Sequence, residues 1–265
     1  MTGPIDFHNH LIPGVDDGAA DESQSADGLR AFVAQGITRI VVTPHIDGSL
    51  TLHPDALAAR LQEIDAGWER LQRVVAEQFP ELDVRRGVEV MLDTPEPNLS
   101  EDRLRLDGGR FALVEFPFMS VPPHSARVLE VLVRAGVTPI VAHPERYSGV
   151  TPDSPLPAEW RAAGALLQVN AGSIKGRYGP PARHIAFALL ERGIVDYVCS
   201  DYHARGRPAT AGARTILAGM DGAEQADLLM VVNPRRMLAG EAPIPVPPLR
   251  ASRRSSWSRM LRWLK

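Results

Sequence analysis

The sequence predicts an α/β fold built on a parallel sheet. Short apolar runs with strand character alternate with longer helical patterns along the 265 residues. Gly36, Gly136 and Gly193 each follow a helical pattern and precede the next strand-like run, which is the usual place for a glycine that ends a helix. Repeated βα units imply a parallel sheet with right-handed crossovers. Seven such units favour a closed barrel, although the same count is compatible with an open sheet.

The expected elements follow one another with few interruptions. Strands are expected at residues 5–10, 39–43, 84–90, 111–115, 139–142, 166–170 and 197–199. Helices are expected at residues 22–35, 54–78, 124–135, 157–163, 180–192 and 209–217. A Pro-rich segment at residues 242–248 then precedes a basic tail. We therefore expect a single barrel domain over residues 1–241, and a linker with a tail over residues 242–265.

Composition narrows the class of protein. The chain is 44% apolar and 23% charged, as in soluble globular proteins, and Cys199 is its only cysteine, which fits a reducing cytoplasm. The tail 250–265 carries +6, so the first 249 residues carry −9, since the whole chain carries −3. An acidic body argues against a nucleic-acid partner. Glycine-rich nucleotide-binding motifs are absent from the sequence.

The first expected strand carries polar residues where a core strand should be apolar. Asp6, His8 and His10 stand at alternate positions, and alternate residues of a strand face the same side. Two imidazoles on one face suggest a metal site, whereas packing at a strand end is the plain alternative. The remaining strand ends decide between these two interpretations.

Ionisable residues also follow the other expected strands, at the end where parallel α/β barrels build their active sites. The candidate metal ligands at these ends are His8, His10, His45, Glu89, Glu115, His143, Asp201 and His203, and the adjacent pair Asp16 and Asp17 lies six residues after His10. Histidine and carboxylates without cysteine favour zinc, manganese or iron over ions that prefer thiolates. A set this large suits two or three ions, and such centres generate hydroxide from bound water for phosphoryl transfer.

These motifs resemble a known family. The chain has D-x-H-x-H at 6–10, T-P-H at 43–45, G-x-E at 87–89, A-H-P-E-R at 142–146 and S-D-x-H at 200–203. In order and spacing they are similar to those of the PHP (polymerase and histidinol phosphatase) superfamily. The segments HNHLIPGVDDGA, AHPERY and QVNAGS are especially similar to its bacterial tyrosine-protein phosphatase branch, which is often encoded with capsule and exopolysaccharide genes. The resemblance covers residues 4 to 240 and implies a distorted (β/α)7 TIM-like barrel.

The resemblance also implies a trinuclear site. It assigns His8, His10, Glu89 and Asp201 to a first metal, with Glu89 bridging to a second metal that Glu115 and His143 complete. A third metal would be held by Asp17, His45 and His203. Manganese is the first choice of ion, with zinc or iron as alternatives. Asp16 beside Asp17 remains an alternative ligand, and Asp6 is expected to orient an imidazole from outside the ligand shell.

Arginines are expected to hold the phosphate. Arg146, in A-H-P-E-R, matches the family's phosphate-binding arginine, and Arg207 matches a second. Arg205 flanks Gly206 on the other side, so either Arg205 or Arg207 could serve. A guanidinium can grip two phosphoryl oxygens at once.

A cysteine mechanism is the alternative chemistry. Cys199 and Arg205 have the C-x5-R spacing of cysteine-dependent tyrosine phosphatases. Asp201 would repel phosphate inside that loop unless a metal neutralised it, and Cys199 falls on an apolar strand end where a buried thiol is the default. The metal mechanism is therefore preferred.

The expected function is a metal-dependent protein-tyrosine phosphatase, a phosphoric monoester hydrolase that uses metal-bound hydroxide. The resemblance implies a phosphotyrosine protein as substrate, in particular a bacterial tyrosine autokinase of capsule or exopolysaccharide synthesis. A phosphatase of a small ester such as histidinol phosphate is one alternative, and a catalytically inactive metal-binding regulatory protein is another.

The basic tail predicts a separate feature. Trp257, Met260, Leu261 and Leu264 have amphipathic helical spacing with arginines between them, which suits an anionic membrane surface. A cytoplasmic protein that lies peripherally at the inner face of the membrane is then expected. A tail docked on the barrel or disordered is the alternative.

Overall fold

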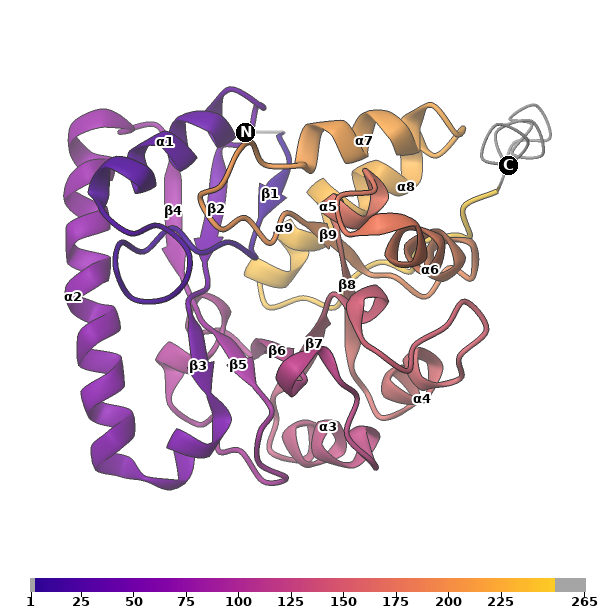
Figure 1. The fold of residues 1–265 in the computed structure, drawn as a ribbon, viewed down its shortest axis with the longest axis horizontal. Helices are drawn as coiled ribbons and strands as arrows, with labels where there is room; N and C mark the ends of the chain where they lie inside the picture. The colour runs from indigo at the N-terminus through magenta and orange to yellow at the C-terminus, as the bar shows by residue number, and fades with distance from the viewer. Residues whose placement is uncertain (1–2, 251–265) are drawn as a thin grey trace.

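The computed structural model describes residues 3–250, in which parallel strands are surrounded by helices (Figure 1). The strands are β1 (Ile5–Asp6), β2 (Arg39–Val42), β3 (His45–Asp47), β4 (Asp83–Arg86), β5 (Glu89–Met91), β6 (Phe111–Glu115), β7 (Thr138–Ala142), β8 (Leu166–Asn170) and β9 (Tyr197–Cys199). The helices are α1 (Glu22–Val33), α2 (Pro54–Gln78), α3 (Ser125–Arg134), α4 (Leu156–Ala162), α5 (Ala171–Ile174), α6 (Gly179–Glu191), α7 (Thr210–Ala218), α8 (Ala223–Asp227) and α9 (Asn233–Leu238).

The strands pair in parallel in two sheets. One has the order β1-β2-β4 and the other the order β3-β5-β6-β7-β8-β9. The strand predicted at 84–90 is two strands, β4 and β5, and β3 is a short strand that the sequence did not predict. The break falls at Pro44, which has no N–H to donate to a ladder. Gly87 N still donates to Val42 O (2.9 Å) and Glu89 N to Pro44 O (3.0 Å), so the two sheets run on from each other.

Hydrogen bonds also join the first and last strands. Asp201 N donates to His8 O (2.8 Å) and His10 N donates to Tyr202 O (2.9 Å), just beyond β1 and β9. The strands therefore form the ring of a distorted α/β barrel, with β2–β3 and β4–β5 each acting as one interrupted strand. The seven predicted strand positions are all occupied, and the helices lie outside the ring (Figure 1).

Two apolar clusters fill the molecule. The smaller one joins side chains from several strands, among them Phe7, Phe111, Ile140 and Tyr197, and Met237 of α9 packs with them. The larger cluster includes most of the buried apolar side chains of the helices. With its interior packed, the barrel leaves only its rim for chemistry.

The Pro-rich segment predicted as a linker packs on the barrel. Ile244 N donates to Asn233 Oδ1 (2.8 Å) and Leu249 N donates to Leu190 O (3.0 Å). Val246 and Leu249 are buried. The packed part of the chain thus extends to Leu249, while the tail predicted as an amphipathic helix lies outside the described residues apart from Arg250. Within residues 3–250, no helix combines the length and apolar character needed to cross a membrane.

Candidate metal centre

The nine predicted ligands converge at the carboxyl ends of the strands. His8, His10 and Asp17 follow β1, Glu115 ends β6, His143 follows β7, and Asp201 and His203 follow β9, whereas His45 and Glu89 begin β3 and β5 just beyond the ends of β2 and β4. The donor atoms of eight of these residues form three overlapping groups: His8, His10, Glu89 and Asp201; His10, Asp17, His45 and His203; and His45, Glu89 and Glu115. The ninth, His143, belongs to none of these groups. Within each group the donor atoms all lie within 4.8 Å of one another.

The first group is buried. His8 Nε2 lies 3.0 Å from Glu89 Oε2 and 3.3 Å from Asp201 Oδ1. His10 Nε2 lies 3.5 Å from the same two oxygens, and it is buried without a hydrogen-bond partner. An unpaired buried nitrogen facing two carboxylates is costly unless a cation lies between them. These four residues are the set that the resemblance assigns to the first metal.

The second group opens toward solvent. His203 Nε2 and His45 Nε2 lie 3.3 and 3.6 Å from Asp17 Oδ1, and the Asp17 side chain is 62% exposed. Asp16 instead accepts a hydrogen bond from His10 Nδ1 (2.8 Å) and another from Gly18 N (3.0 Å). The geometry therefore separates the two aspartates: Asp17 faces the cluster, whereas Asp16 holds the ring of His10.

Glu89 and Glu115 form the third group with His45, which differs from the set that the resemblance implies. His45 Nδ1 lies 3.3 Å from both Glu89 Oε2 and Glu115 Oε1. His143 Nε2 lies 3.2 Å from Glu89 Oε1 and 3.7 Å from Glu115 Oε2. Glu89 and Glu115 thus lie between the imidazoles of His45 and His143. His45 directs Nδ1 to these glutamates and Nε2 to Asp17 of the second group.

Strained backbone places two of these residues. His143 (φ 36°) and Asp201 (φ 51°) adopt left-handed conformations where strands β7 and β9 end. Such conformations cost on the order of 1–3 kcal/mol each in residues other than glycine, and they gather at functional sites.

The cluster strongly perturbs its own protonation. Burial by itself lowers the pKa of His8, but the charges of Glu89 and Asp201 outweigh it and raise that pKa to about 9. Burial also raises the pKa of Glu89, yet His8 and the other imidazoles hold it well below its usual range. Without a metal, a proton thus occupies the imidazole of His8 beside the carboxylates, and an ion that binds there must displace it.

A chain of side-chain amides supports the first group. His8 Nδ1 lies 2.8 Å from Gln168 Oε1, which can only accept, so Nδ1 carries the proton and Nε2 keeps its lone pair for a metal. Gln168 Nε2 donates to Asn170 Oδ1 (2.9 Å), and Asn170 Nδ2 donates to Asp201 Oδ2 (2.7 Å). Sequence reasoning missed both roles, although buried amides at the end of β8 were the available signal.

The role predicted for Asp6 is wrong. Its carboxylate accepts from Ser200 N (2.8 Å), Ser200 Oγ (3.1 Å) and Asn9 Nδ2 (3.3 Å), and it lies 3.3 Å from the backbone N of His8. It therefore fastens the chain after β1 to the chain after β9 instead of orienting an imidazole. The reason is that backbone and hydroxyl donors of the adjoining strand end occupy its oxygens.

Arg146 reaches into the cluster. Arg146 Nη1 donates to Asp201 Oδ2 (2.6 Å), and its guanidinium carbon lies 4.2 Å from the centre of the Tyr178 ring. A Cβ on Gly172 would come within 2.8 Å of that ring, so glycine allows the ring to lie there. Tyr178, which sequence reasoning did not single out, thus fixes one face of the guanidinium while the Arg146 side chain stays 24% exposed.

The other two candidate arginines lie at the edge of the cluster. Arg205 Nη2 donates to Asp17 O (3.2 Å), next to the second group. Arg207 is exposed, and its carbonyl oxygen accepts from Arg177 Nη2. Arg205 therefore has the side-chain contact nearer to the candidate ligands.

Cys199 does not fit a nucleophile. It is fully buried in β9 and belongs to the smaller apolar cluster. Burial raises the pKa of its thiol well above the usual value, so the reactive thiolate is not available. The C-x5-R spacing is therefore a coincidence of sequence.

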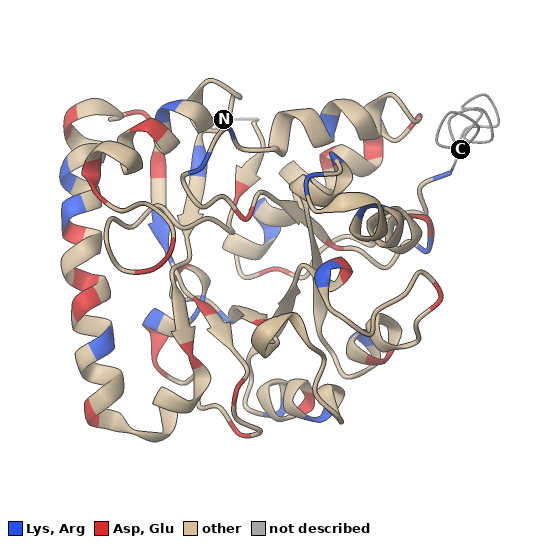
Figure 2. Ribbon diagram, viewed as in Figure 1, with Lys and Arg blue, Asp and Glu red and all other residues tan. Residues whose placement is uncertain are grey.

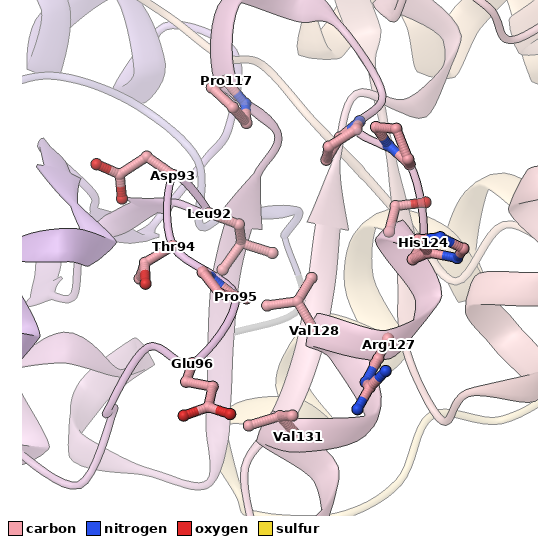
Figure 3. Close-up of a pocket in the computed structure, with 13 residues that line it drawn as sticks. Leu92, Asp93, Thr94, Pro95, Glu96, Pro117, His124, Arg127, Val128 and Val131 are labelled. Atoms are coloured by element: carbon pink, nitrogen blue, oxygen red, sulfur yellow. The ribbon is translucent and has the colours of Figure 1, made fainter.

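A cavity of about 500 Å³ lies between the loop after β5 and helix α3 (Figure 3). The loop Leu92–Glu96 after β5 lines one side, and the first turns of α3 line the other. None of the nine candidate ligands lines this cavity. The chemistry is thus confined to the strand ends.

The donor set fits divalent cations. Four carboxylates (Asp17, Glu89, Glu115 and Asp201) and five imidazoles converge there, with no thiolate among the candidate ligands. The unpaired Nε2 of His10 points between two of the carboxylates. Such a centre on the carboxyl rim of an α/β barrel defines a class, the metal-dependent barrel hydrolases.

Comparison with known proteins identifies the family. A family model described as capsular polysaccharide synthesis, CpsB/CapC, matches residues 4–239, so the chain belongs to the CpsB/CapC family. The tyrosine-protein phosphatase YwqE of Bacillus subtilis is 31% identical over 202 residues, 75% of this chain and 77% of YwqE. The tyrosine-protein phosphatase CpsB of Streptococcus pneumoniae is 27% identical over 243 residues, 88% of this chain and 98% of CpsB.

Solved structures agree with this assignment. A crystal structure from work on YwqE and CpsB, described as unique metal-dependent tyrosine phosphatases, superposes with a TM-score of 0.73 at 28% identity. The match covers 93% of this chain and 99% of that chain. The phosphotriesterase of Mycobacterium tuberculosis shares the fold alone, with a TM-score of 0.54 at 14% identity over 92% of this chain and 96% of its own.

Proposed function

We propose that this protein is a metal-dependent protein-tyrosine phosphatase that hydrolyses phosphotyrosine on proteins. The observation that carries the proposal is the convergence of the candidate ligands with Arg146, whose guanidinium lies on Asp201. A phosphoryl group needs cations on its oxygens during transfer, and this rim offers metal ligands and a guanidinium together. The named relatives YwqE and CpsB are tyrosine-protein phosphatases, which supports the same substrate class here.

Ligands would be divided among two or three divalent ions. His8, His10, Glu89 and Asp201 would hold the first ion, and Glu89 would bridge to a second with Glu115 and His143. Asp17, His45 and His203 would hold a third. His45 Nδ1 also lies 3.3 Å from a carboxylate oxygen of both Glu89 and Glu115, so in a protein with two ions His45 would be a ligand of the second ion. Oxygen and imidazole donors suit manganese first, with zinc or iron as alternatives.

The chain's own groups would then bind and orient the substrate. Ions held here would lower the pKa of water and neutralise charge on the phosphoryl group. Arg146 would bind a phosphoryl oxygen with the N–H groups that Asp201 leaves free, and Arg205 or Arg207 would bind from the opposite edge. Gln168 would keep the Nδ1 proton of His8 in place, so that Nε2 remains a ligand. The more exposed group around Asp17 is the side from which substrate would enter.

We further propose a cellular role. The family's link to capsular polysaccharide synthesis supports a tyrosine autokinase of capsule or exopolysaccharide synthesis as the protein substrate. Such a substrate would be met in the cytoplasm at the inner face of the membrane. The basic tail 250–265 would contact anionic lipid there, because its +6 charge stands on a chain that is otherwise acidic.

The test compares two substrates on metal-loaded protein. Activity should be higher on a phosphotyrosine peptide than on histidinol phosphate, and His8→Ala should abolish it. Preference for the small ester would reject a protein substrate. Equal activity of the His8→Ala variant would reject the metal mechanism.

A further inference from the structure

An exposed arc of cationic residues lies beside the candidate metal centre. Lys175, Arg177, Arg205 and Arg207 are all exposed and come from two segments, one before α6 and one before α7. Arg177 Nη2 donates to the carbonyl of Arg207, which ties the segments together. The Lys175 side chain lies against Gly212 of α7, since a Cβ there would be 2.8 Å from its Cδ. We call these four residues the basic arc.

The basic arc adjoins both ends of the phosphate site. Arg205 donates to Asp17 O, next to His45 and His203. Arg177 precedes Tyr178, whose ring lies on Arg146. A substrate with its phosphate at Arg146 would therefore extend its flanking residues over or beside the arc.

Many of the arginines outside the basic arc are paired with carboxylates. Arg39, Arg85, Arg86, Arg103, Arg134, Arg161, Arg214 and Arg236 each form an ion pair with a carboxylate. Among the ion pairs of residues 3–250, none joins a member of the basic arc to a carboxylate. The side chains of Arg177 and Arg205 instead donate to the backbone carbonyls of Arg207 and Asp17. Figure 2 shows Asp and Glu positions distributed along most of the ribbon, with Lys and Arg positions among them.

Unpaired cations side by side repel one another and favour an anionic partner. The first 249 residues carry −9, so the basic arc is a local concentration of positive charge on a part of the chain whose net charge is negative. The same acidic body disfavours a long polyanion such as nucleic acid, which would extend past the arc onto repulsive surface. A short acidic peptide fits both observations.

We propose that the basic arc, through Lys175 and Arg177, binds acidic side chains flanking the phosphotyrosine of a peptide substrate. The proposal rests on the proposed function for the position of the phosphotyrosine. The arc would act as a specificity surface, since its members Lys175 and Arg177 lie outside the candidate metal and phosphate ligands. Rim charges of this kind alter association rate and salt dependence.

Binding tests the proposal without turnover. The probe is a peptide carrying a non-hydrolysable phosphonate analogue of phosphotyrosine, flanked by Asp and Glu, and its control has Asn and Gln at the same positions. Fluorescence anisotropy with metal-loaded protein should give the acidic peptide about tenfold lower Kd at low salt, and the difference should shrink as salt rises. Equal Kd values for the two peptides would overturn the proposal. Stronger binding of a single-stranded oligonucleotide of equal charge would also overturn it.

Variants locate the effect. Arg177→Gln and Lys175→Gln should each reduce the preference about two- to fivefold, the range for an exposed charge pair. Arg177→Lys keeps the charge and should keep the preference, which separates charge from the hydrogen bond to Arg207. Arg134→Gln removes an exposed charge on α3, far along the chain from the arc, and should have no effect. A preference that survives the Lys175→Gln/Arg177→Gln double variant would place the selectivity elsewhere and reject the arc.

Turnover distinguishes this proposal from the proposed function. Hydrolysis of p-nitrophenyl phosphate should be unchanged by Lys175→Gln and Arg177→Gln. Selective peptide binding without phosphotyrosine hydrolysis would reject the phosphatase and retain the arc. Phosphotyrosine hydrolysis without selective binding of the acidic peptide would retain the phosphatase and reject the arc.

Discussion

The two ends of the barrel use charge in opposite ways. At the amino ends of β2 and β4, Arg39 and Arg85 pair with Asp83, and Arg85 also pairs with Asp107. Cations and carboxylates are equal in number there. At the carboxyl ends, four carboxylates meet five histidines, and among residues 3–250 only Arg146 forms an ion pair with them as a permanent cation. The difference shows that the amino end is complete as folded, whereas the carboxyl end requires cations from solution.

Loss of the central carboxylate should have the largest effect. Glu89→Gln removes the charge that faces His8, His10, His45 and His143, so kcat on a phosphotyrosine peptide should fall about a thousandfold or more. Bound metal, counted by mass spectrometry, should fall in parallel. Wild-type metal content and a normal kcat in the Glu89→Gln variant would contradict the claim that the carboxyl end of the barrel requires metal ions.

Loss of the amide behind His8 should have the next largest effect. Gln168→Leu keeps the volume but leaves the Nδ1 proton of His8 without its acceptor. Metal affinity should fall about 10- to 100-fold, as for other residues that orient metal ligands. Calorimetric titration of metal-free protein measures it. Unchanged affinity would show that packing alone orients the ring.

Loss of the Tyr178 ring, which lies against the guanidinium of Arg146, should have a moderate effect on activity. Tyr178→Leu should lower kcat/KM about three- to tenfold, in keeping with a partly buried cation–π contact. Tyr178→Phe retains the ring and should stay within about twofold of wild type. The effect should vanish in an Arg146→Ala background, whereas a general structural defect would persist there.

Metal-free protein should lose stability as the pH rises. The pKa of His8 is raised to about 9 from its ordinary 6.5, because Glu89 and Asp201 outweigh burial. Its protonation therefore stabilises the folded state below pH 6.5, and the contribution is lost as the pH rises through 9. Tm should fall by several degrees over this window, at about 2–4 °C per kcal/mol. His8→Asn should flatten the curve, and a metal-free Tm that rises with pH would contradict the assignment.

Loss of an ion pair at the amino ends of the strands should have the smallest effect. Arg39→Gln breaks a partly exposed pair with Asp83, so unfolding free energy should fall by about 1 kcal/mol or less. Urea denaturation measures this change. Activity should be unchanged, and a large loss of activity would mean that this end also serves catalysis.

Much of the centre could be predicted from sequence because parallel strands end on one rim. His8, Glu89, His143 and Asp201 each follow a strand, so strand order alone brought them together. Pro44 explains the main error in the fold, since it interrupts the ladder and leaves β3 as a separate strand. The choice between Asp16 and Asp17 depended on where each side chain points within one loop, which spacing cannot tell.

The supporting contacts could not be predicted for a different reason. Gln168 and Asn170 are ordinary buried amides until His8 and Asp201 are placed against them. Tyr178 acquires its role only where the chain before α6 crosses Arg146. The basic arc likewise joins residues about 30 positions apart, which only the packing of α5 beside α7 brings together.

Anomalous diffraction from crystals of manganese-loaded protein tests the central claim most directly. Two or three peaks are expected between the carboxylates and imidazoles at the carboxyl ends of the strands. Glu89 is expected to contact two of them. No peak is expected among Arg39, Asp83, Arg85 and Asp107. An empty carboxyl-end cluster in active protein would contradict the account.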